Sequence, residues 1–365
     1  MTPGVPEVRV AAVVVNWNGA DDLPTCVAAL RSQDHPLDAV VVVDNASSDG
    51  SRAVLEPLAD DDHAVPVRVV WNATNRGFAG GANDGIAAVG DVDAVLVCNP
   101  DVQPAPDCLR HAVAALAADP RRGAVQARLH RTVMSPSGEP VIDTTGHLAF
   151  TTRLFRNRGE GEVDRGQWDA PGEVFGVSGA LALYRRAMLD DVAIEVADRG
   201  GRTRTEVFDE DLFAFWEDVD LDWRAAMRGW VTWYEPLAVA RHERGGAGPR
   251  RTARVEQLNW QNRLLTLVKD DTWAGIARGL PGLVLTTLLK TGELVLTVPS
   301  AFLAALRDWR LVGVMLRKRR AVHGRATVPS EQVVARWFTG FDYAAWVRTW
   351  WRRVRGVPVG HEPGA

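Results

Sequence analysis

The chain has 365 residues, of which 46% are hydrophobic and 24% charged, a composition typical of a folded globular protein and not of a disordered one. Its length allows one large domain with an appendage, or two domains. Three cysteines without CxxC spacing exclude a disulfide scaffold and favour a reducing compartment. The net charge of −4 hides a basic C-terminal end, because the residues from 301 onward contain 12 Lys or Arg against 4 Asp or Glu.

The first 130 residues alternate between apolar, β-branched runs and segments with helical spacing of their apolar residues. Strands that alternate with helices across short connections predict a mostly parallel sheet with helices on both faces. Ligands of such sheets bind at the carboxyl ends of the strands. The predicted strands are 8–17, 39–45, 67–71, 93–99 and 123–127, and the predicted helices are 21–33, 47–59, 77–89 and 106–118.

The next part of the chain is less regular. Residues 131–205 are rich in Gly, Arg and Thr and predict loops and short strands, although 174–189 contains a turn of small residues that leads into a strand and a helix. The acidic, aromatic segment 207–230 has helical spacing, and a strand is expected from residue 231.

The last hundred residues differ in kind. Segment 279–306 is apolar, but Lys290, Glu293 and two prolines interrupt it, which argues against a simple transmembrane helix. The end interleaves arginine with tryptophan, a pattern typical of a helix that lies in a bilayer interface and meets anionic lipid. An amphipathic helical hairpin packed on the body is the alternative. The tryptophan content argues against nucleic-acid binding, and an N-terminus without a secretory signal predicts a cytoplasmic protein, peripheral at the inner face of the cell membrane.

Polar residues stand where the predicted strands end: Asn16 and Asn18, then Asp44 and Asn45, then Asn99 and Asp101. A carboxylate at a strand end can accept hydrogen bonds from a base or from sugar hydroxyls. Ser47 or Ser48 is expected to cap the following helix, which would leave Asp44 free for a ligand.

The segment from Asn75 to Asn83 is a glycine-rich start of a helix, where backbone amides can approach a phosphate closely. Arg76 beside it favours a phosphate or base contact, whereas a packing role for the glycines is the alternative. The spacing is not GxGxxG, so a dinucleotide site of the Rossmann type is not expected.

Two further motifs carry ionisable groups. Glu217 and Asp218 lie among aromatic residues, and partial burial of either carboxylate would suit it as a general base, although acidic helix faces are usually solvated. His242 ends a predicted strand before a glycine loop and could complete a metal or diphosphate site with Asp101, although a lone histidine is more often structural.

Taken in order, these segments resemble inverting glycosyltransferases of family 2, which have the GT-A fold. The resemblance spans roughly residues 8–265, and its later motifs are similar to the bacterial rhamnosyltransferase and galactofuranosyltransferase-like branch. It is carried by NWN at 16–18, DNASSDG at 44–50, NRGFAGGAND at 75–84, FGVSGALALYRRAML at 175–189, FDEDLFAFWEDVDLDWRAAMRGW at 208–230 and ARHERGG at 240–246.

The resemblance implies an α/β, GT-A architecture, with a single Rossmann-like, mostly parallel sheet flanked by helices. A glycosyltransferase domain would cover 1–265, with a nucleotide-sugar-binding half at 1–130 and an acceptor and catalytic half at 131–265. A helical, basic, membrane-associating extension would follow at 266–365.

The resemblance also implies the roles of individual residues. Asp218 becomes the base, next to Glu217, Asp101 a metal ligand, and His242 a metal or diphosphate contact. Mg²⁺ or Mn²⁺ would neutralise the diphosphate of a dTDP- or UDP-sugar, and a single displacement would invert the anomeric configuration. The expected nucleotide-sugar contacts are Asn16, Asn18, Asp44, Asn45, Arg76, Gly77, Asn83 and Asn99.

Asn99 stands where many nucleotide-sugar enzymes have the first aspartate of an Asp-x-Asp pair. An asparagine can still offer a neutral carbonyl oxygen, and Mg²⁺ commonly keeps few protein ligands. We therefore expect weaker metal affinity in the absence of donor, with metal dependence retained.

The leading hypothesis is transfer of L-rhamnose from dTDP-rhamnose to a lipid-linked or cell-envelope glycan, with a polyprenyl-diphosphate-linked acceptor favoured by the basic end. Galactofuranosyl transfer from UDP-galactofuranose is the nearest rival, and a soluble acceptor is a further alternative. A catalytically silent nucleotide-sugar-binding subunit is the alternative from another class. Homo-oligomerisation is left open.

Overall fold

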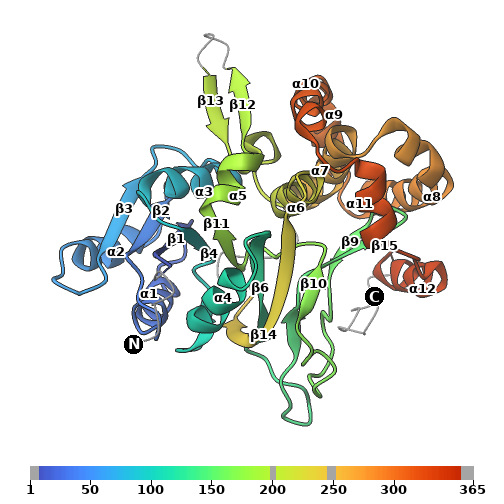
Figure 1. Cartoon of the computed structure of the whole chain (residues 1–365). Helices are drawn as coiled ribbons and strands as arrows, with labels where there is room; N and C mark the ends of the chain where they lie inside the picture. The colour runs from blue at the N-terminus through green and yellow to red at the C-terminus, as the bar shows by residue number, and fades with distance from the viewer. Residues whose placement is uncertain (1–7, 198–202, 245–251, 355–365) are drawn as a thin grey trace.

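The protein is described by a computed structural model that covers residues 8–197, 203–244 and 252–354. Gly245 and Gly246 of the last motif, and the end of the chain from residue 355, lie outside these ranges. Figure 1 shows a central sheet with the N-terminal elements on one side and the C-terminal helices gathered on the other.

The first half builds the parallel part of the sheet, close to the predicted boundaries. β1 lies between β2 and β4, and β3 pairs with the outer side of β2, all in parallel. The elements are β1 (Val10–Asn16), α1 (Leu23–Arg31), β2 (Ala39–Asp44), α2 (Ser51–Ala59), β3 (Val67–Trp71), α3 (Gly77–Ala88), β4 (Ala94–Cys98), β5 (Val102–Pro104), α4 (Cys108–Ala117) and β6 (Arg122–Arg131).

The second half continues the same sheet with mostly antiparallel pairs. β11 lies antiparallel between β4 and β6, and the long β14 runs parallel to β6. The α/β class and the helix-flanked sheet are therefore confirmed, while the parallel pairs described in this large sheet are those among β1–β4 and the β6–β14 pair. The elements are β7 (Ile142–Thr144), β8 (His147–Phe150), β9 (Phe155–Asn157), β10 (Gly172–Val174), β11 (Leu181–Arg185), α5 (Arg186–Val192), β12 (Ile194–Ala197), β13 (Thr203–Glu206), a 3₁₀ turn η1 (Glu210–Leu212), α6 (Glu217–Met227) and β14 (Val231–His242).

The core divides into two layers because successive residues of a strand face opposite sides of the sheet. Val10, Ala12 and Val14 of β1 pack with α1, α2 and α4, whereas Ala11, Val13 and Val15 pack with α3, α5 and α6. The unbroken apolar runs of β1 and β2 are explained by this burial on both faces.

The C-terminal helices are joined to the body by a third apolar cluster. Trp223 of α6 packs in it with Val322 of α10, Val333 of α11 and Phe338 of β15, and β15 pairs with β8. The predicted domain boundary at 265 lies inside α7. The elements are α7 (Ala253–Asp270), α8 (Trp273–Thr297), α9 (Pro299–Arg307), α10 (Arg310–Arg325), α11 (Ser330–Trp337), β15 (Phe338–Thr339) and α12 (Tyr343–Val354).

By length and composition, α8 is apolar enough to cross a membrane, and 17% of its most apolar window is buried. The interruptions at Lys290 and Glu293 are therefore a weaker argument against a spanning helix than the sequence suggested. The two side chains form an ion pair of 3.1 Å within the helix.

Candidate active site

The strand ends named by the sequence meet at one edge of the sheet. Asn16 lies beside Asp44 in the register of β1 and β2, and β4 ends on the other side of β1. The backbone N–H of Asn99, just past β4, donates to the carbonyl of Ala180 at 2.8 Å. This edge therefore brings the polar residues after β1, β2 and β4 close together, as predicted.

Asp44 is tied into this edge. Its carboxylate accepts a hydrogen bond from Asn16 Nδ2 at 3.0 Å and from the backbone N–H of Ser47 at 3.2 Å. The prediction that Ser47 or Ser48 caps the next helix is wrong, because α2 begins at Ser51, whose N–H donates to Asp49. Asp44 is accordingly less free than expected, and its contact with the nucleotide-sugar donor stays a prediction.

Asn16 and Asn18 hold the loops after β1 and β2 together. Asn18 adopts a left-handed backbone, with φ of 54°, and its side-chain oxygen accepts from the N–H of Ser48 at 2.7 Å. Asn16 is fully buried, and its Oδ1 has no hydrogen-bond partner among the described residues. An unpaired hydrogen-bond acceptor such as this Oδ1, at the edge formed by the carboxyl ends of the strands, is suited to a hydrogen-bond donor of a ligand.

The glycine-rich segment approaches protein backbone. Gly77 has φ of +71°, and a Cβ added there would lie 2.2 Å from the carbonyl oxygen of Phe213. The N–H of Ala79 donates to that same carbonyl at 3.0 Å, and Asn45 Nδ2 donates to the carbonyl of Gly77 at 2.7 Å. The packing alternative thus has direct structural support, and a phosphate contact of Gly77 stays a prediction.

Arg76 and Asn83 are occupied by the segment that precedes α6. Arg76 forms ion pairs with Asp84 and with Glu210, the latter at 2.7 Å. Asn83 accepts from the backbone N–H groups of Val207 and Phe208 and donates to Glu210. Both side chains therefore connect α3 to residues 207–210. For either side chain to contact the nucleotide-sugar donor, it would have to leave these partners or bind the donor in addition to them.

Asp101 and His242 are brought together by the short strand β5. Val102 pairs with His242 across the β5–β14 ladder, and His242 Nε2 lies 3.3 Å from Asp101 Oδ1. On its other side, His242 Nδ1 lies 2.8 Å from the buried carboxylate of Asp143, which Arg131 and Arg244 also contact. Burial lowers the pKa of His242, but its bonds to Asp101 and Asp143 outweigh this and raise it to about 9.

One carboxylate and one imidazole offer two ligands of the kind that Mg²⁺ or Mn²⁺ accepts. Asp143 would fix the ring so that Nε2 faces the ion, as outer partners of metal-binding histidines do. In the part of the chain that the structure describes, no cluster of three or more His, Cys, Asp or Glu side chains could hold an ion. The site therefore fits a metal only if substrate oxygens and water supply the other ligands.

The carboxylates of Glu217 and Asp218 differ in setting. Asp218, 19% exposed, accepts from the backbone N–H of Gly179 at 3.1 Å. Glu217 is buried, and its Oε2 has no partner among the described residues. Burial and the neighbouring Asp218 charge raise the pKa of Glu217 well above its usual value. The raised pKa favours the neutral form of Glu217, so the more exposed Asp218 is the better candidate for a base.

The backbone before these residues is strained. Phe213, Phe215 and Trp216 have φ of 64°, 68° and 75°, although none is glycine. Asn262 of α7 holds this loop, because its Nδ2 donates to the carbonyls of Leu212 at 2.7 Å and Phe215 at 2.8 Å. The helical spacing noted over 207–230 is realised only in part, because α6 begins at Glu217 and ends at Met227.

Sequence reasoning missed four side chains at this site: Asp143, His147, Asp222 and Asn262. The first two lie in a region interpreted as loops. Asp222 follows Asp218 by four residues, a spacing that places both on one face of α6 and could have been noticed. Asn262 carried no local signal, because its partners are some 50 residues away.

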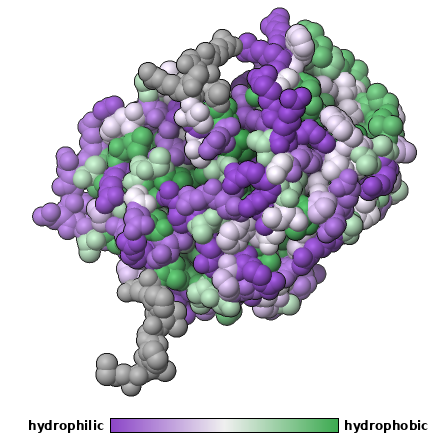
Figure 2. Space-filling view, turned by 45° about the horizontal axis from the view of Figure 1, so that its top comes forward, coloured by the Kyte–Doolittle hydropathy of each residue, from purple (hydrophilic) through white to green (hydrophobic). Residues whose placement is uncertain are grey.

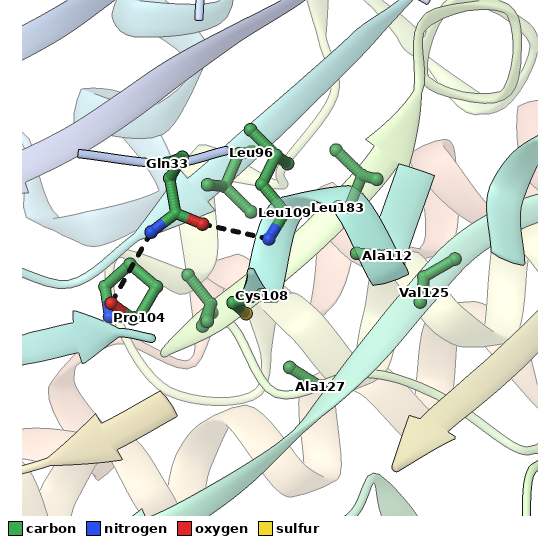
Figure 3. Close-up of a pocket in the computed structure, with 10 residues that line it drawn as sticks. Gln33, Leu96, Pro104, Cys108, Leu109, Ala112, Val125, Ala127 and Leu183 are labelled. Atoms are coloured by element: carbon green, nitrogen blue, oxygen red, sulfur yellow. Dashed lines mark hydrogen bonds between the residues drawn. The ribbon is translucent and has the colours of Figure 1, made fainter. Parts of the chain in front are cut away.

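Two cavities that described residues line do not coincide with this edge. Figure 3 shows one of about 10 Å³ beneath the sheet, where Gln33 connects the carbonyl of Pro104 with the N–H of Leu109. This space is too small for a substrate. Gln33 instead anchors β5, the strand that sets Asp101 against His242.

Comparisons with known proteins agree on the family. The model of "Glycosyl transferase family 2" matches residues 11–193. An N-acetylglucosaminyl-diphospho-decaprenol L-rhamnosyltransferase of Mycobacterium tuberculosis is 27% identical over 252 residues, which are 64% of this chain and 75% of the relative.

Among solved structures, GalNAc-T7 with UDP, GalNAc and Mn²⁺ covers 95% of this chain and 58% of its own, with a TM-score of 0.61 and 10% identity. This likeness supports the GT-A fold alone. Because the family model spans half of the chain and includes the edge described above, this protein is a glycosyltransferase that belongs to family 2.

Proposed function

We propose that this chain is an inverting glycosyltransferase that transfers L-rhamnose from dTDP-rhamnose to a hydroxyl of a lipid-linked or cell-envelope glycan. The observation that carries the proposal is the placement of Asp218. Gly179 holds its carboxylate, and the adjacent Ala180 is bonded to Asn99 at the end of β4. The base thus lies next to the edge where family members bind the donor, and the mycobacterial relative supports the choice of sugar.

In the proposed reaction, Asp218 accepts the proton of an acceptor hydroxyl. The acceptor oxygen attacks the anomeric carbon while the bond from that carbon to the diphosphate breaks, so one displacement inverts the configuration. The raised pKa of the buried Glu217 favours its neutral form, which would limit the negative charge next to Asp218.

Asp101 and His242 would hold a divalent ion together with donor oxygens, with Asn99 as a neutral neighbour. Such an ion would stabilise the charge of the departing diphosphate. His242 Nε2 lies 3.3 Å from Asp101, and the raised pKa of His242 favours its protonated form. A protonated ring would compete with a metal ion for this nitrogen, which supports weak affinity in the absence of donor.

The test is transfer by the purified full chain from dTDP-rhamnose to an N-acetylglucosaminyl-diphospho-polyprenol, followed by mass spectrometry with Mn²⁺ or with EDTA. We expect Asp218→Asn to lower the rate by roughly 10²- to 10⁴-fold, the usual contribution of a general base, while donor binding by thermal shift persists. Asp190→Asn, an exposed aspartate on α5, is the matched control.

Other results would redirect the proposal. Turnover of UDP-galactofuranose in place of dTDP-rhamnose would favour the galactofuranosyl alternative. Donor binding without transfer or hydrolysis, unchanged in Asp218→Asn, would contradict the enzyme hypothesis and favour a silent binding subunit.

We further propose that the C-terminal extension rests on the anionic inner face of the cell membrane. Most large hydrophobic side chains that are exposed among the described residues lie between Trp273 and Trp351. Figure 2 shows hydrophobic side chains gathered on the side where the C-terminal helices lie. Exposed apolar side chains next to a basic segment fit a bilayer that also carries a lipid-linked acceptor.

A further inference from the structure

His147 of β8 lies inside the acceptor half, against the helix that carries the proposed base. It is buried, and its backbone N–H donates to the carbonyl of Gly176 at 2.9 Å. The turn that follows Gly176 also provides the N–H of Gly179, which binds Asp218. One turn of backbone therefore positions both His147 and the base.

The ring of His147 stands between two carboxylates of α6. Its Nδ1 lies 2.7 Å from Asp222 Oδ2, and its Nε2 lies 3.6 Å from Asp218 Oδ2. Asp218 and Asp222 are four residues apart and so lie on one face of the helix. The arrangement is a short row of carboxylate, imidazole and carboxylate.

Asp222 is built into this row. The N–H of Val177 donates to its Oδ1 at 3.1 Å, and a Cβ at Gly176 would lie 1.7 Å from its Oδ2. Only glycine at 176 leaves room for this carboxylate behind the imidazole. The contact of Asp222 with His147 therefore depends on α6, on β8 and on the turn at Gly176 and Val177.

The surroundings of the ring are otherwise acidic or apolar. Glu217 lies on the same helix as the two aspartates, and the buried hydroxyl of Tyr184 on β11 also lies within the field of these carboxylates. Like charges in a buried cluster disfavour each other's ionisation. A cation within the cluster offsets this repulsion.

The ionisation of the ring agrees with this geometry. Burial lowers the pKa of His147, but the charge of Asp218 and the bond to Asp222 outweigh it, so the net pKa lies above its usual value. For Asp222, burial exceeds the influence of His147 and raises the pKa to about 6. The two carboxylates that fix the ring therefore also favour its protonated form.

We propose that His147 is a positioning residue that orients Asp218, with Asp222 fixing the imidazole from behind. This inference rests on the proposed function, because it assigns Asp218 the role of base. The atoms that move are unchanged: the acceptor proton passes to Asp218 as the glycosidic bond forms and the bond to diphosphate breaks. Asp218 afterwards returns the proton to water.

The first experiment needs no substrate. In the full chain with ¹⁵N-labelled histidine, we expect NMR titration to give His147 a pKa above that of an exposed histidine. The pKa should fall in both Asp218→Asn and Asp222→Asn. His130, which faces Asp164 at 2.7 Å, should be unchanged in both variants and serves as the internal control. A His147 ring that is neutral at pH 7, or one indifferent to Asp218→Asn, would overturn the proposal.

The second experiment follows transfer. Without the imidazole, the carboxylate of Asp218 loses the partner that orients it. We therefore expect His147→Gln to lower kcat roughly tenfold while the KM for the donor changes little. His130→Gln should keep the kcat and KM of the wild type.

The two proposals fail in different ways. A His147→Gln variant that loses donor binding together with its rate would mean a structural role only, and one with the kcat of the wild type would mean no role; either result would contradict the inference. Intact coupling in the NMR titration, together with no transfer from any donor, would contradict the proposed function and leave the coupled row itself established.

Discussion

At the scale of single residues, close backbone approach decides what several motif positions do. The carbonyl of Phe213 lies where a side chain of residue 77 would be, and the loop from Phe213 to Trp216 leads directly into Asp218. The glycine-rich segment therefore shapes the loop before Asp218. A phosphate contact of this segment stays a prediction.

Gly77→Ala should be clearly destabilising. An alanine with φ near +71° costs about 1–2 kcal/mol, and the contact with Phe213 adds to that cost. Gly90→Ala is the matched control, because Gly90 has φ of +80° but no atom within 4 Å of an added Cβ. Urea unfolding should give Gly77→Ala the lower stability by more than about 1 kcal/mol. Equal losses would show that the close approach has no energetic effect.

At the scale of secondary-structure elements, a buried ionic cluster joins the C-terminal helices to the body. Lys269 of α7 contacts Asp209 and Asp220, and Lys318 of α10 contacts Asp209 and, at 3.0 Å, Glu206. Burial raises the pKa of Asp209, but the two lysines outweigh it and hold the pKa well below its usual range. The segment before α6 is thereby clamped by α7 and α10 together.

Lys318→Met should reduce the free energy of unfolding at neutral pH by about 3 kcal/mol, because it leaves buried carboxylates without this partner. The folded-state pKa of Asp209 is lowered, so its contribution is present above the unfolded value of about 4 and is lost as the pH falls further. The stability curves of wild type and variant should therefore converge in acid. Arg320→Met, at an exposed position of the same helix, should change little. Parallel curves down to pH 2 would contradict the assignment.

At the scale of the whole molecule, the extension is both a part of the core and an exposed apolar surface. Val322, Val333 and Phe338 are buried against α6, so deletion of the residues from 301 onward would open the core. Point substitutions on the exposed side chains of α8 test the membrane proposal more cleanly.

Leu288→Asp and Leu296→Asp, at positions 65% and 68% exposed, should abolish or strongly reduce flotation of the protein with anionic vesicles. A charge at these positions opposes burial in lipid, while the fold loses little because the side chains are exposed. Leu237→Asp, 60% exposed on β14, is the control and should float as the wild type does. Flotation that is unaffected by the α8 variants would exclude this surface as the membrane contact.

The sequence predicts best those elements whose burial leaves a local, periodic pattern of apolar residues. Strands such as 39–45 and helices such as 77–89 were predicted nearly to the residue, because burial on one or two faces imposes a periodic pattern. The hairpin β12–β13 and the strands β8, β9 and β15 were not assigned, because short or partly exposed strands carry weak patterns.

By itself, the sequence determined the α/β class, the sheet edge at which polar residues gather, and the family to which the chain belongs. These follow from local periodicity and from ordered motifs. The tertiary structure alone decided which motif side chains are engaged elsewhere, as Arg76 and Asn83 are, and which unpredicted groups, above all His147, lie beside Asp218. Such contacts join residues far apart in the chain, and neither composition nor spacing records the distance between them.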